Sequence, residues 1–188
     1  MLQRLHGAAR ELGAVLAPAR IVRRVIKRHR AIVGIGLQVP HAESYRLPSA
    51  DFDRLARLDR PPGDETILLA EPEIDDLLWL WRRVFHERVH LAFQAKRFSP
   101  SRIREHVHRL GRVEFDEMRR ILRNDHLLLP PHDDAEVYEE FAARYLERLH
   151  FDPESLPQFF PVVVERRTEI ETLLAGDFDA AKLLRMTR

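Results

Sequence analysis

The sequence has no cysteine, only three lysines and no long uninterrupted apolar run. The absence of cysteine excludes disulfides, thiol catalysis and zinc sites built on thiolates, and it is typical of proteins from a reducing compartment. No apolar run approaches the roughly 18 residues that a membrane span needs. The N-terminus has no apolar segment followed by a small-residue cleavage site, so the sequence does not predict secretion. We therefore expect a cytoplasmic protein without a membrane span.

Charge is distributed unevenly along the chain, although the net charge of the 188 residues is only +1. Residues 1–46 hold nine basic and two acidic side chains, a local charge of +7, and residues 47–188 hold 22 basic and 28 acidic ones, a local charge of −6. This division predicts a basic N-terminal helical arm (1–46) on a helical body (47–188), together forming one compact domain. The helical pattern continues to the last residue, so the sequence also fits the N-terminal part of a longer protein.

Helical periodicity dominates the sequence, and it predicts a mainly α fold, an irregular multi-helix bundle. Alternating apolar residues at 34–40 and 66–70 allow one small β-ribbon near residues 34–70. Residues 2–16 are expected to form one helix. The longest helix is expected from Pro72 to about Phe98, and a later one over 135–150, capped by Asp133 or Asp134.

One motif with chemical meaning, His86-Glu87-Arg88-Val89-His90, lies in the middle of the longest expected helix. Residues four apart share a helix face, so the imidazoles of His86 and His90 can reach the same zinc ion. Glu87 is placed to take a proton from a metal-bound water. A carboxylate from a later helix would complete three protein ligands and leave the fourth position open. The candidates for this third ligand are Glu136, Glu139 and Glu140.

In these residues the chain resembles the zincin metallopeptidases, and the resemblance implies a zinc-dependent hydrolase. It covers the five-residue motif and a later glutamate. Arg88 departs from the family pattern, in which the two residues between the glutamate and the second histidine are usually uncharged. In a competing interpretation, the two histidines are polar or half-buried positions of an amphipathic helix, and no cofactor is bound. The core side of that helix would then consist of Leu77, Leu80, Val84 and Leu91.

A second feature is a stripe of basic residues spaced i, i+3, i+4, i+7 and i+8 on an expected helix. The stripe consists of Arg20, Arg23, Arg24, Lys27 and Arg28. Such a stripe can lie along nucleic-acid phosphates or another anionic partner. Alternatively, its charges are paired with the acidic stretch from Asp64 to Asp76.

Three functions follow from these features. The first expectation is a helical interaction or scaffold module with a protein partner and no catalytic chemistry, because a helical bundle alone fixes no function. The first alternative is a zinc-dependent, metallopeptidase-like hydrolase with Glu87 as the catalytic residue. The second alternative is a nucleic-acid-associated protein that uses the basic helix.

Overall fold

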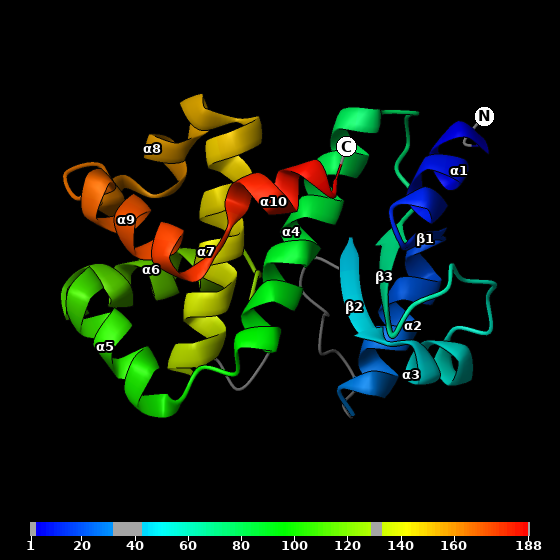
Figure 1. The fold of residues 1–188 in the computed structure, drawn as a ribbon, viewed down its shortest axis with the longest axis horizontal. Helices are drawn as coiled ribbons and strands as arrows, with labels where there is room; N and C mark the ends of the chain where they lie inside the picture. Colours follow the sequence, from blue (N-terminus) through cyan, green and yellow to red (C-terminus); the bar gives the residue numbers. More distant parts are fainter. Residues whose placement is uncertain (1–2, 32–42, 129–132, 188) are drawn as a thin grey trace. The chain divides into compact units, whose positions relative to one another are not determined.

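A computed structural model of the chain describes residues 3–31, 43–128 and 133–187. Within these ranges the chain forms ten α-helices and a three-stranded sheet (Figure 1). The predicted mainly α fold with a small β element is therefore confirmed. The contacts of the chain divide it into two compact units, Met1–Glu87 with Met186–Arg188, and Arg88–Arg185.

The sheet belongs to the first unit and consists of β1 (Ala14–Ala17), β2 (Ser44–Pro48) and β3 (Glu65–Ala70). Its order is β1-β3-β2, with β1 parallel and β2 antiparallel to β3. The central strand β3 is buried from its second residue to its last, as expected for a strand covered on both faces. The sequence predicted this strand, whereas the other expected strand, at 34–40, lies outside the described residues.

Strand β1 overturns the prediction of one helix over residues 2–16. Helix α1 (Gln3–Glu11) ends before Gly13, whose φ of 78° is the left-handed conformation that glycine adopts without strain. The chain then pairs in parallel with β3, with Ala14 opposite Ile67 and Ala17 opposite Ala70. Local periodicity misses this strand because its pairing partner lies far along the sequence.

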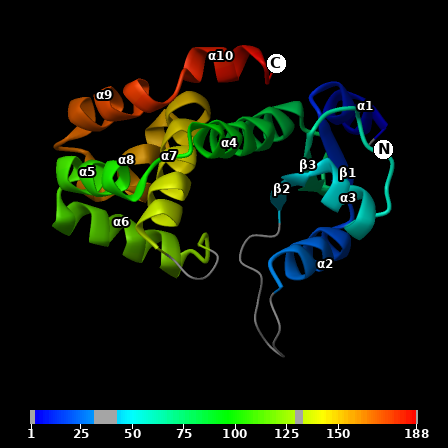
Figure 2. The same cartoon turned by 60° about the horizontal axis from the view of Figure 1, so that its bottom comes forward.

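Two helices of the first unit, α2 (Ala19–His29) and α3 (Ser49–Leu55), pack against the sheet (Figure 2). Helix α2 buries Val22, Val25 and Ile26 completely or nearly so. Its polar side is therefore the side turned to solvent. The expected boundary near residue 46 falls within β2, inside the first unit.

Helix α4 (Leu77–Lys96) is uninterrupted and carries the chain from one unit into the other. It begins at Leu77 rather than at the expected Pro72, because Asp76 Oδ1 accepts a hydrogen bond of 2.9 Å from the Leu78 N–H and so caps the first turn. Among the described residues, no helix combines the length and the apolar character that crossing a membrane requires.

The second unit is helical throughout its described part. Its helices are α5 (Pro100–Leu110), α6 (Arg112–Asn124), α7 (Asp134–Phe151), α8 (Leu156–Phe159), α9 (Arg167–Asp177) and α10 (Ala180–Arg185). Helix α7 contacts α5, α6 and α8, and most of its apolar side chains are buried. Of the two predicted caps, Asp133 rather than Asp134 caps α7, with its Oδ1 accepting a 2.9 Å hydrogen bond from the Glu136 N–H.

Candidate metal centre

Helix α4 places both histidines of the motif in the interior. His86 is 2% exposed and His90 is 5% exposed, so both are buried more deeply than half-buried positions of an amphipathic helix. Of the four leucine and valine residues expected to form the core side of α4, Leu80 and Val84 are buried, whereas the other two are half-buried. Because α4 is continuous from Leu77 to Lys96, the one-turn spacing of the histidines is fixed by the helix itself.

His90 lies between two carboxylates of α7. Its Nδ1 is 2.8 Å from Glu139 Oε1, and its Nε2 is 3.3 Å from Glu140 Oε2. An ionised carboxylate only accepts hydrogen bonds, so Nδ1 carries the proton that is donated to Glu139. In a neutral His90 the lone pair of Nε2 then faces Glu140 Oε2, which is also an acceptor. The approach of these two atoms becomes favourable when a cation lies between them, either a second proton on His90 or a metal ion.

His86, His90 and Glu140 bring three possible ligand atoms together, one from each residue, all within 4.8 Å of one another. A tetrahedral zinc ion with bonds of about 2.0–2.2 Å holds neighbouring ligand atoms about 3.4 Å apart. The 3.3 Å between His90 Nε2 and Glu140 Oε2 already matches that spacing. Two imidazoles and one glutamate are a donor set of catalytic zinc sites.

The three candidate glutamates of α7 lie in different places. Glu140 belongs to the cluster, and its Oε1 accepts a 2.8 Å hydrogen bond from the Arg144 Nε–H, which leaves Oε2 directed at His90. Glu139 contacts the other nitrogen of His90 and so fixes the tautomer and orientation of the ring, as carboxylates behind metal-bound histidines do. Glu136, in the first turn of α7, is not part of the cluster formed by the described residues.

Glu87, the expected catalytic residue, is 3% exposed and is held by two residues of β2. Its Oε1 accepts a 2.6 Å hydrogen bond from Ser44 Oγ, and its Oε2 lies 3.4 Å from Arg46 Nη1. Both contacts favour the ionised carboxylate and restrict its orientation. Its neighbour Arg88 is half-buried, and burial lowers the pKa of the Arg88 guanidinium.

Comparison of the chain with protein-family models, with curated proteins and with solved structures gave no match. The resemblance to zincin metallopeptidases therefore depends on the motif, together with the arrangement of His86, His90 and Glu140.

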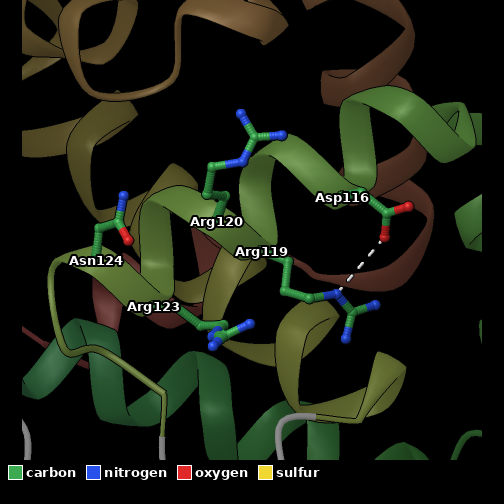
Figure 3. A pocket seen from close by; sticks show the side chains of 5 residues that line it. All are labelled: Asp116, Arg119, Arg120, Arg123 and Asn124. Atoms are coloured by element: carbon green, nitrogen blue, oxygen red, sulfur yellow. Dashed lines mark ion pairs between the residues drawn. The ribbon is translucent and has the colours of Figure 1, made fainter.

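Helix α6 also carries several arginines, but at least two of them are paired with carboxylates, unlike the basic stripe of α2 among the described residues. Asp116, Arg119, Arg120, Arg123 and Asn124 line a pocket on α6 (Figure 3). Arg119 pairs with Asp116 at 3.6 Å and also with Asp134, and Arg120 pairs with Glu117 at 2.6 Å. Carboxylates thus neutralise most of the positive charge around this pocket.

A buried polar cluster in the second unit was missed in the sequence analysis. The Tyr138 hydroxyl donates a 2.6 Å hydrogen bond to Asp177 Oδ2, and His106 Nε2 lies 3.1 Å from the same oxygen. The His106 and Tyr138 rings are stacked with centroids 4.8 Å apart. All three side chains are almost completely buried, and they join α5, α7 and α9. No local motif links these residues, because their spacing in the sequence follows no pattern.

Proposed function

We propose that the chain is a metal-dependent hydrolase that binds one zinc ion through His86, His90 and Glu140 and cleaves amide bonds of peptides. The observation that supports this proposal is the convergence of two imidazoles from α4 and one carboxylate from α7. The expectation of an interaction module without catalytic chemistry, and that of a cytoplasmic location, stay predictions.

Each residue of the centre has a defined role in this proposal. His86, His90 and Glu140 would hold the zinc ion, which when bound would acidify a water molecule and polarise the substrate carbonyl. Glu87 accepts the proton of the water as general base. Glu139 holds the Nδ1 proton of His90, so that Nε2 faces the metal position.

Metal content tests the proposal directly. We expect the purified chain, equilibrated with micromolar zinc and then desalted, to retain about one zinc ion per molecule, the number that one site holds. The variant His90→Ala should retain almost none. His108→Ala is the matched control, because His108 is exposed on α5 and is remote in sequence from the motif, and it should retain zinc like the unmodified chain.

Two outcomes of this measurement contradict the proposal. Absence of metal from the unmodified chain would show that His86, His90 and Glu140 do not form a zinc site. Exclusive retention of iron would instead favour the two-histidine, one-carboxylate iron centre of oxygenases.

The positioning role of Glu139 gives a second prediction. The variant Glu139→Gln should bind zinc about 10- to 100-fold more weakly, because an amide accepts the Nδ1 proton of His90 less strongly than a carboxylate. Competition with a coloured zinc chelator measures the affinity. Glu136→Gln, on the same helix but outside the cluster, is the control and should bind as tightly as the unmodified chain. Equal affinities for all three proteins would remove Glu139 from the site.

A further inference from the structure

The solvent side of α2 carries an unusual concentration of positive charge. All five residues of the basic stripe are exposed. From Arg20 to Arg28 they extend about 12 Å along the helix, given a rise of about 1.5 Å per residue. The first turn of α2 contains no acidic residue, and Pro18 caps it without a side-chain hydrogen bond. The positive charges therefore find no compensation within the helix.

Carboxylates elsewhere in the chain do not neutralise this stripe. Among the described residues, none of the five basic side chains forms an ion pair, and the alternative in which they pair with the stretch from Asp64 to Asp76 is wrong. The acidic residues of α3 have other partners, since Asp51 pairs with Arg54 at 2.6 Å and Asp53 with Arg60 at 2.9 Å. The residues outside the described ranges include no aspartate or glutamate.

The buried side of α2 restricts the kind of anionic partner. Val22 and Val25 are fully buried and Ile26 is 2% exposed, so the apolar face is used inside the first unit. A helix that lies in a membrane surface needs a free apolar face to insert among the lipids. Helix α2 can therefore contact a partner only through the positive side chains on its solvent side.

Four of the five cations are arginines, whose planar guanidinium groups bind phosphate oxygens in pairs of hydrogen bonds. Each strand of duplex nucleic acid presents about one negative charge per 3.4 Å of its axis, so a row of about 12 Å spans roughly three to four phosphates of one strand. The stripe contains no aromatic side chain to stack on bases. We propose that α2 binds the phosphate backbone of duplex nucleic acid without reading its sequence. This proposal is independent of the metal centre.

Binding of a fluorescein-labelled duplex DNA of mixed sequence, followed by fluorescence anisotropy between about 50 and 200 mM KCl, tests the proposal. If all five cations contact phosphates, log K should fall with log[KCl] with a slope of about −4.5. The triple variant Arg23→Gln, Arg24→Gln, Arg28→Gln should bind more weakly, with a slope shallower by about 2.7 units. A duplex of unrelated sequence should give the same curves.

The matched control removes three exposed arginines of the second unit, as Arg104→Gln, Arg123→Gln, Arg185→Gln, with the same change in net charge. It should keep most of the affinity and the slope of the unmodified chain. Three results would overturn the proposal: no binding at the lowest salt concentration, equal losses in both triple variants, or binding only to phosphatidylserine vesicles. The last result would identify a membrane surface as the partner.

Discussion

Replacing Glu87 by glutamine is expected to leave zinc retention unchanged and to slow peptide hydrolysis by about 10²- to 10⁴-fold, the usual contribution of a general base. Glutamine has the shape of glutamate and can still accept the hydrogen bond from Ser44 Oγ, but it cannot take a proton at neutral pH. The change therefore separates proton transfer from packing. Glu87 is not among the three residues whose ligand atoms converge, so its removal should not release the metal.

The measurement uses the zinc-loaded chain with a mixed library of cellular peptides, and mass spectrometry follows the appearance of new termini. The control is Ser44→Ala, which removes the 2.6 Å hydrogen bond to Glu87 but leaves the carboxylate in place. Its rate should fall less than that of Glu87→Gln, because the carboxylate that takes the proton stays in place, although a hydrogen bond to a charged group is worth about 1.5–3 kcal/mol. If Glu87→Gln cleaves at the unmodified rate, Glu87 is not the base. If the zinc-loaded chain cleaves nothing, the hydrolase proposal fails.

The motif on α4 illustrates how much of the site the sequence predicts. Helical spacing alone placed His86 and His90 on one face, and an acidic cap at Asp133 predicted the start of the partner helix α7. Spacing does not choose among Glu136, Glu139 and Glu140, because all three lie within about one turn of α7. The choice depends on how far α7 is displaced along its axis and rotated about it, and both are set by the packing of its buried face.

The elements that the sequence analysis missed depend on contacts between distant residues. Strand β1 contains Val15 and Leu16 in an apolar run that continues the pattern of α1, and only its parallel pairing with β3 makes it a strand. The burial of His106 and Asp177 is likewise invisible in the sequence, since each lies on a helix that by itself is merely amphipathic. Caps and periodicity are local signals, whereas pairing and polar clusters are decided when the helices pack.

Asp177→Ala is expected to lower the free energy of unfolding at pH 7 by about 3 kcal/mol, because it removes a buried carboxylate and leaves buried polar groups without their acceptor. The substitution leaves the buried Tyr138 hydroxyl without its acceptor and His106 Nε2 without its neighbouring carboxylate. Urea unfolding measures the change. Tyr138→Phe removes one hydrogen bond and should cost only about 1–2 kcal/mol. Glu165→Ala, an exposed carboxylate of the same unit, is the control and should stay within about 0.5 kcal/mol.

The pH dependence of the difference in unfolding free energy between the unmodified chain and Asp177→Ala tests whether Asp177 is ionised. Burial raises the pKa of its carboxyl, but the neighbouring His106, the hydrogen bond from Tyr138 and the positive charge of Arg102 together outweigh burial, and the pKa in the folded chain lies below the ordinary value of 3.8. A carboxyl whose pKa is lowered by folding stabilises the fold above its unfolded pKa and loses this contribution as the pH falls through its folded pKa. The contribution of the ionised carboxylate to the gap in stability between the unmodified chain and Asp177→Ala should therefore be lost as the pH falls below about 4. A gap that instead widens on acidification would mean that folding raises the pKa of Asp177 above its unfolded value.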